Sequence, residues 1–188
     1  MPKAKLYQVE VIAFDDSSAP KGVGFRMKSS LKNGKGYLEF YKTNNGMHGD
    51  EFYLIEFSLT DDTKHPARDL KFVSDLAHVV WTKITNDPNE CLNSWPGNSY
   101  SEFQAISVPT SDSLIVLNLD SQQQLFAFAL NFVSGLDSDS DPANFITYDP
   151  IGENRNGGVR NQSAAAIIIA GLAIAGVVAG VAAINGAW

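Results

Sequence analysis

A run of 21 residues near the C-terminus has no polar side chain. This run restricts the possible structures of the chain more than any other feature of the sequence. Residues 164–184 comprise nine alanines, five isoleucines, three valines, three glycines and one leucine. As an α-helix this run would measure about 32 Å at 1.5 Å per residue, close to the roughly 30 Å hydrocarbon thickness of a bilayer. The run predicts a long apolar C-terminal helix within residues 164–188. Such a helix either spans a membrane or is buried among other protein.

Large and small side chains separate on this predicted helix when its residues are placed at 100° intervals. Ile174, Val177, Val178, Val181 and Ile184 fall on one face, with Leu172 as an exception to the separation. The opposite face carries only glycine and alanine, at Gly171, Ala175, Gly176, Ala179, Gly180 and Ala183. Small residues at this spacing let two helix backbones approach closely, so that van der Waals packing holds them together. This glycine-zipper pattern predicts self-association of helices from several copies of the chain.

Basic residues precede the predicted helix, and none follows it. Arg155 and Arg160 lie before the helix and Trp188 lies after it. The positive-inside rule then keeps the preceding domain cytoplasmic, with Arg160 at the near membrane interface and Trp188 at the far one. The N-terminal residues lack the apolar core of a secretory signal, so we expect a tail-anchored protein. The alternative is a soluble or extracellular assembly in which the helix is buried.

Residues 1–150 have the pattern of a β-sheet protein. Short apolar runs alternate with turn-forming residues, as in LYQVEVIAF (6–14), YLEFYK (37–42), FYLIEFSL (52–59), LAHVVWTKI (76–84), LIVLNL (114–119) and LFAFALNFV (125–133). This spacing predicts an antiparallel β-sandwich of immunoglobulin-like or jelly-roll-like type. Asn-Gly pairs separate residues 23–28, 37–42 and 52–59, which we expect to form a meander. Residues 151–163, rich in glycine and asparagine, are expected to form a linker to the helix.

The end of the β-rich region resembles a known bacterial group. The segments SLIVLNLDSQQQLFAFALNFVSG (113–135) and FITYDPIGENRNGG (145–158) are similar to small β-sandwich domains of the DP-EP and AidA-like inclusion-body type. Those domains end with a pattern like L-x-V-x-N, Y-x-Y-x-L-x-F and Y-D-P-x-I-x-N. The similarity covers residues 113–157, and the chain departs from the pattern at residues 152–156 (GENRN), where an apolar residue and a short NGN-type ending are expected. The resemblance implies a sandwich fold, and it transfers no functional residue.

Charge and residue types exclude several function classes. The net charge of −7 and pI near 4.8 argue against a nucleic-acid-binding face. A single cysteine, Cys91, excludes a disulfide framework and a cysteine-rich zinc site. The chain has neither the G-x-S-x-G elbow of a serine hydrolase nor a phosphate-cradling glycine loop after a strand. We therefore expect no enzymatic activity and no cofactor.

One acidic loop has part of a calcium-binding pattern. Asp137, Asp139 and Asp141 place three carboxylates at alternate positions, like the first half of an EF-hand loop. Pro142 stands where that loop needs glycine, and Tyr148 stands where it needs an acidic residue, so an EF-hand is excluded. A looser calcium site remains the alternative to a solvated acidic loop.

These patterns together favour a structural protein. The predicted function is that of a non-enzymatic subunit that assembles through its small-residue helix into a homo-oligomer or filament. The assembly is expected to be membrane-associated, with its own copies and membrane lipid as partners and with the β-domain displayed. Two alternatives stay open. One is a pore-forming effector whose helix inserts into a membrane, and the other is a binding domain held by its tail anchor.

Overall fold

The computed structural model describes residues 4–31, 36–42, 47, 51–64, 68–92, 94, 100–135 and 137–155. Within these ranges the chain is mainly β, as predicted, with two sheets and three short helical turns. The turns are η1 (Pro20–Gly22), α1 (Leu76–Val79) and η2 (Pro142–Asn144). The predicted C-terminal helix lies outside the described residues.

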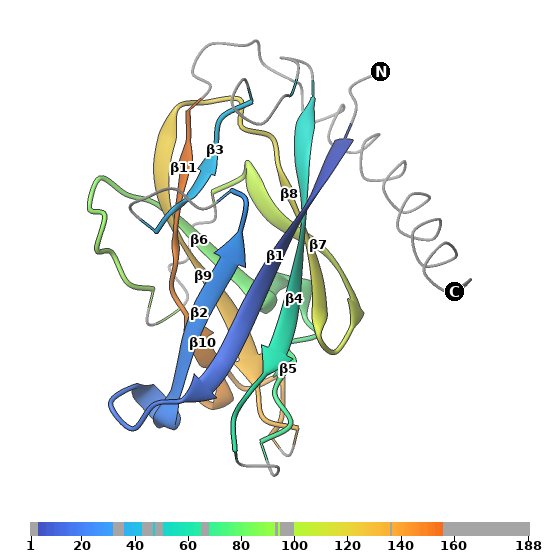
Figure 1. Cartoon of the computed structure of the whole chain (residues 1–188), viewed down its shortest axis with the longest axis vertical. Coiled ribbons are helices and arrows are strands. Elements are labelled where there is room, and N and C mark those ends of the chain that lie inside the picture. The colour runs from blue at the N-terminus through green and yellow to red at the C-terminus, as the bar shows by residue number, and fades with distance from the viewer. Residues whose placement is uncertain are drawn as a thin grey trace.

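The first sheet has the strand order β2-β1-β4-β8-β7 (Figure 1). Its strands are β1 (Ala4–Asp15), β2 (Val23–Ser29), β4 (Phe52–Asp61), β7 (Phe103–Thr110) and β8 (Ser113–Asn118). The alternation along β1 gives it one buried face, with Val9, Val11 and Ala13 in the core, while Gln8 and Glu10 lie on the opposite face. β1 pairs parallel with β4, whereas the other pairs in this sheet are antiparallel.

The second sheet is built around β9 (Gln124–Val133), which is buried along most of its length. Leu130 pairs with both Tyr148 of β10 and Val80 of β6, so these two strands lie on opposite edges of β9. The strands along one edge are β10 (Ile146–Tyr148) and β11 (Ile151–Asn154), and those along the other are β5 (Lys71–Phe72) and β6 (Val80–Ile84). β3 (Leu38–Phe40) pairs parallel with β11 at the outer edge.

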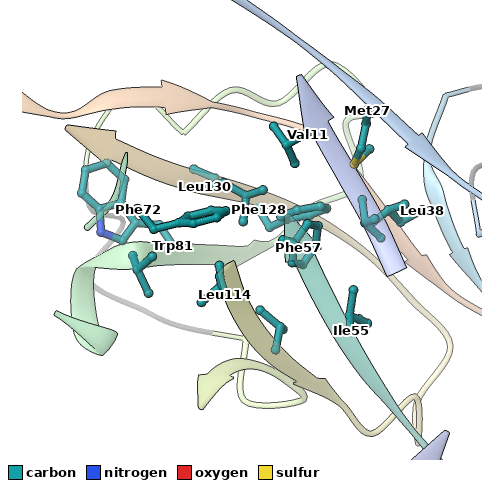
Figure 2. Close-up of a cluster of buried hydrophobic side chains, with 14 of the residues drawn as sticks. Val11, Met27, Leu38, Ile55, Phe57, Phe72, Trp81, Leu114, Phe128 and Leu130 are labelled. Atoms are coloured by element: carbon teal, nitrogen blue, oxygen red, sulfur yellow. The ribbon is translucent and has the colours of Figure 1, made fainter. Parts of the chain in front are cut away.

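The two sheets enclose one hydrophobic core, to which both contribute large side chains (Figure 2). Phe57 of β4 and Phe128 of β9 face each other across it, with their ring centroids 6.2 Å apart. Phe103 of β7 lies 4.9 Å from Phe128. All three rings are fully buried, and each aromatic side chain removed from water contributes about 2 to 3 kcal/mol to folding. The two sheets are therefore held together by a shared aromatic core.

The strand pairing differs from the sequence prediction in two ways. Both sheets are mixed rather than antiparallel, because β1 pairs parallel with β4 and β11 pairs parallel with β3. The predicted meander is wrong, because β2 pairs with β1, β4 lies between β1 and β8, and β3 belongs to the other sheet. A turn-forming sequence indicates that the chain reverses, but the partner strand is decided by which edges the tertiary packing leaves open.

Two strands lie where the sequence predicts none, and one predicted strand begins as a helical turn. β7 shifts register between Ala105 and Ser107, and such a bulge breaks the alternation that marks a strand. β11 occupies the first four residues of the predicted linker. Residues 76–79, predicted as strand, form α1 because the Asp75 side chain caps the turn by accepting from the Ala77 N–H at 2.8 Å.

No helix among the described residues has the length and apolar character needed to cross a bilayer. The segment predicted to do so, residues 164–184, belongs to the range 156–188, which the structure does not describe. Its membrane insertion and its self-association therefore stay predictions.

Candidate functional site

A buried polar cluster lies at the end of the molecule where β7 begins and where β8 and β11 end. It consists of Tyr100, Glu102, Asn118 and Asn154, each of which is 6% exposed or less. Polar groups at this depth are stable only when they are hydrogen-bonded. We call these four residues the Glu102 cluster, and we treat it as the candidate site because it joins three segments that are distant in the sequence.

Asn118 and Asn154 connect the two sheets through their side-chain amides. Asn118 Nδ2 donates to Asn154 Oδ1 at 2.8 Å, and Asn154 Nδ2 donates to Asn118 Oδ1 at 3.2 Å. Asn118 ends β8 in the first sheet, and Asn154 ends β11 in the second. Both residues lie in the segments that carry the resemblance described above. This amide pair fastens the end of β11 to the opposite sheet.

Glu102 accepts hydrogen bonds on both carboxylate oxygens. Oε2 accepts from the N–H groups of Ser121 at 2.9 Å and Gln122 at 3.3 Å, and from the Tyr100 hydroxyl at 3.1 Å. Asn154 Nδ2 donates to the same oxygen at 3.4 Å, and the Ser121 hydroxyl donates to Oε1. A carboxylate with this many donors is satisfied inside the protein. It holds the loop after β8 against the start of β7.

The surroundings of Tyr100 keep its hydroxyl group protonated, so that it donates a hydrogen bond. Burial, together with the charge of Glu102, raises the pKa of Tyr100 above its ordinary value, so the phenol keeps its proton. Its backbone N–H donates to Thr82 Oγ1 at 2.7 Å, which links the cluster to β6. The polar groups of the cluster are bonded mainly to one another. The arrangement connects the two sheets by buried hydrogen bonds at the end of β11.

Arg155, directly after the Glu102 cluster, adds further contacts between the end of β11 and β3. Its N–H donates to the Phe40 carbonyl at 3.0 Å, and its guanidinium lies 3.7 Å from Glu39 and 3.3 Å from Glu153. These ion pairs are partly exposed, so each contributes only about 0 to 1 kcal/mol. The backbone bond attaches residue 155, which lies within the predicted linker 151–163, to β3.

Asp149 is a second buried polar group, between β10 and β11. Burial raises the pKa of Asp149 to about 6, and a hydrogen bond from the Leu92 N–H opposes this rise. Its Oδ1 atom has no hydrogen-bond partner among the described residues, and neither does Nε1 of the buried Trp81. Asp149 therefore binds a proton at mildly acidic pH, which links its state to the stability of the fold.

The carboxylates of the acidic loop before β10 accept hydrogen bonds from neighbouring groups of the protein. Asp139 accepts from the Ser74 hydroxyl at 2.5 Å, and this hydrogen bond lowers the pKa of Asp139. Asp141 caps η2 by accepting from the Ala143 N–H at 3.0 Å. Among the described residues, Asp137 included, no three His, Cys, Asp or Glu side chains gather in a way that could hold a metal ion.

The other residues singled out from the sequence fall into two groups. Cys91 is exposed, and its thiol lies 3.7 Å from the Asn89 carbonyl. The residues predicted for oligomerisation and for the membrane interface lie outside the described part of the chain: Gly171, Ala175, Gly176, Ala179, Gly180, Ala183, Arg160 and Trp188.

The Glu102 cluster was not predicted from the sequence, although one signal for it was present. Asn118 interrupts the apolar run LIVLNL, and a polar residue inside a buried strand requires a partner. Nothing local marks Glu102 or Asn154 as buried, because their partners are distant in the chain. The sequence matches no protein-family model and no curated protein.

Proposed function

We propose that this protein is a non-enzymatic structural subunit that assembles through its C-terminal segment into a homo-oligomer or filament. The assembly is membrane-associated, and it displays the β-domain on the cytoplasmic side. The β-domain belongs to the sandwich type that the segment 113–157 resembles. Its partners are further copies of the same chain and membrane lipid.

The observation that carries this proposal is the segregation of small and large side chains in residues 171–184. Glycine and alanine recur every four residues on one face, and isoleucine and valine occupy the other. Close helix packing requires such a small face, because in lipid there is no hydrophobic force to bring two apolar helices together. A helix that served only as a single anchor would have no need for this segregation.

The contacts at the C-terminal end of the β-domain support the proposal. The described residues of its main core extend from Val9 to Ile151, and Asn154 and Arg155 hold the last described strand in place. The predicted helix is thus attached through a short linker to a fixed point of a separate domain. This arrangement suits a subunit in which one part assembles and the other is displayed.

The test is a comparison of three variants of the full chain by native mass measurement. Gly176→Ile and Gly180→Ile should each reduce the assembled fraction at least tenfold, because a branched side chain at the helix crossing separates the backbones. Val177→Ile is the matched control on the opposite face, and it should assemble like the wild type. Loss of helicity would not explain a defect, since isoleucine favours helix over glycine.

Equal assembly by all three variants would overturn the proposal, because the small face would then not be the contact surface. The size of the detergent-free protein, measured with and without residues 159–188, distinguishes a helix in a membrane from a helix buried in a protein assembly. A soluble large particle that dissociates on truncation indicates an assembly with buried helices. Insoluble full-length protein with a soluble truncated form indicates a membrane.

A further inference from the structure

The face of the first sheet that points away from the core is divided into an apolar and a polar half. The strand register places Leu54 of β4 beside Leu117 of β8 and Leu6 of β1. These residues alternate with the core residues of the same strands, so they lie on the outer face. The apolar half consists of Phe52, Leu54, Ile106, Ile115, Leu117 and Leu119, which form a hydrophobic cluster separate from the main core.

The polar half lies farther along the same strands. Glu10 of β1 accepts from Lys28 of β2 at 3.2 Å and from Thr60 of β4 at 3.1 Å. Glu56 accepts from Ser113 at 3.3 Å. These exposed or half-buried side chains are ordinary for a sheet face in contact with water. The apolar half carries no charged residue, so the outer face changes character along its length.

The apolar half is too well buried for an open sheet face. Phe52, Leu54, Ile115 and Leu117 are 4 to 6% exposed, yet their only hydrophobic packing partners among the described residues are one another, Leu119 and Ile106. A single apolar residue on such a face can be covered by long polar neighbours, as Ile12 can between Arg26 and Thr60. At the edge of the apolar half, Glu56 lies beside Ile115 and Gln104 beside Leu117. The register gives Leu54 only leucine neighbours, and it places Ala4 beside Phe52. Side chains buried to this extent on an outer sheet face are covered by residues outside their own cluster.

The end of the described chain lies beside this surface. Asn154 bonds to Asn118, and Asn118 stands between Leu117 and Leu119 of the apolar half. The amide pair points toward the core, while the two leucines point outward. Residues 156–163 span up to about 27 Å when extended, which is ample to carry residue 164 around to the outer face.

We propose that the apolar segment 164–184 packs as a helix on the apolar half of the outer face of its own chain. The segment has no charged or polar side chain, which matches the uncharged surface. Its Ile/Val face supplies the large side chains that fill a leucine-lined sheet surface, and its small face points away from the sheet.

The apolar half of the face is long enough to hold part of the segment as a helix. Ile115 to Leu119 extends about 14 Å along β8, which corresponds to about nine residues of helix. The apolar half of the face thus covers a little under half of the 21-residue run. The rest of the run stays available for other contacts. This inference concerns the segment in a copy whose helix is not inserted in a bilayer, and it holds whether or not copies associate as proposed above.

Photo-crosslinking in the full chain tests the inference. Leu6→benzoylphenylalanine places the probe at the rim of the apolar half, where Leu6 is 45% exposed and a bulky group is tolerated. Leu117→benzoylphenylalanine places a second probe at its centre. We expect both probes to link to residues 164–184, as identified by peptide mass spectrometry. An unchanged far-UV circular dichroism spectrum shows that each variant has folded, and the Leu6 variant decides the matter if the Leu117 variant has not.

Ser58→benzoylphenylalanine is the matched control, because Ser58 is exposed on the polar half of the same face. It should give no link to the segment. A mixture of ¹⁵N-labelled and unlabelled chains separates links within one chain from links between chains. Mixed labelled–unlabelled links at the frequency of random pairing would show that a second copy covers the face, and no link to residues 164–184 would show that the segment does not. Either result overturns the inference, whereas failure of the proposed assembly would appear only in the native masses of the glycine variants.

Discussion

Gly152 in β11 lies directly against the ring of Phe126 on the neighbouring strand β9. A Cβ atom at this position would overlap three atoms of that ring. Phe126 is fully buried, and its ring packs against those of Tyr100, Phe103 and Phe128. The absence of a side chain at residue 152 is therefore explained by the size of its neighbour.

Gly152→Ala should lower the free energy of unfolding by about 2 kcal/mol, because the ring of Phe126 can move only by disturbing other rings. Gly24→Ala is a close control, since a Cβ there would also overlap a phenylalanine ring, that of Phe14. Phe14 is only partly buried, so it can turn toward solvent, and the loss should stay below about 1 kcal/mol. Urea unfolding of the two variants measures the difference, and equal losses would contradict the account of Gly152.

Asp149 links the stability of the fold to pH. Its folded pKa of about 6 lies above the ordinary value of 3.8, so the folded state binds the proton more tightly than the unfolded state. This contribution to the free energy of unfolding is fully present below about pH 4, and it is lost as the pH rises through 6. After allowance for solvent screening of a half-buried group, the change should amount to about 1 to 2 kcal/mol.

Thermal or urea unfolding between pH 4 and pH 7 measures this effect when the wild type is compared with Asp149→Asn. Groups other than residue 149 contribute equally to both curves, so the difference in slope isolates this carboxyl group. The wild type should lose stability relative to the variant as the pH rises. Parallel curves would show that Asp149 titrates alike in the folded and unfolded states.

At the scale of single elements, β11 is the strand that ties the end of the domain to both sheets. It pairs with β9 on one side and β3 on the other, it buries Ile151, and it carries Asn154 of the Glu102 cluster. Without it, residues 124–127 of β9 lose their partner on that edge, and the hydrogen bonds that Asn154 donates to Asn118 and Glu102 are lost.

A chain that ends at residue 155 should therefore fold, and one that ends at residue 150 should not fold stably. Burial of Ile151 and the buried hydrogen bonds of Asn154 together contribute about 4 kcal/mol or more, a large part of the 5 to 15 kcal/mol typical of a domain. Circular dichroism during thermal unfolding compares the two chains. Equal transitions would mean that the domain closes before β11.

Strands with a regular alternation or a continuous apolar run can be predicted from the sequence. Features that depend on pairing between distant segments cannot. β1 and β9 are recognisable from alternation and from a continuous apolar run, respectively. β7 is interrupted by a bulge, and β11 is four residues long with Gly152 inside it, so neither has a clear period. The parallel pairings and the Glu102 cluster depend on contacts between distant segments, which no local pattern encodes.

At the scale of the whole molecule, charge and apolar surface are divided between two regions. Residues 151–188 contain Glu153, Arg155 and Arg160, a net charge of +1, which leaves −8 on residues 1–150 from the total of −7. Any assembly through the C-terminal segments thus brings acidic domains close together. Helix packing favours association, and repulsion between the domains opposes it.

Association should therefore strengthen as salt rises from about 10 mM to about 150 mM, because the screening length falls from about 30 Å to about 8 Å. Sedimentation at a fixed protein concentration, in one detergent or none, measures the assembled fraction. We expect the dissociation constant to fall several-fold over this range. Gly180→Ile should stay dissociated at both salt concentrations, which separates helix-mediated association from nonspecific salting-out. Dissociation of the wild type by salt would instead show that ion pairs between domains hold the copies together, and the helix would no longer be needed to explain the assembly.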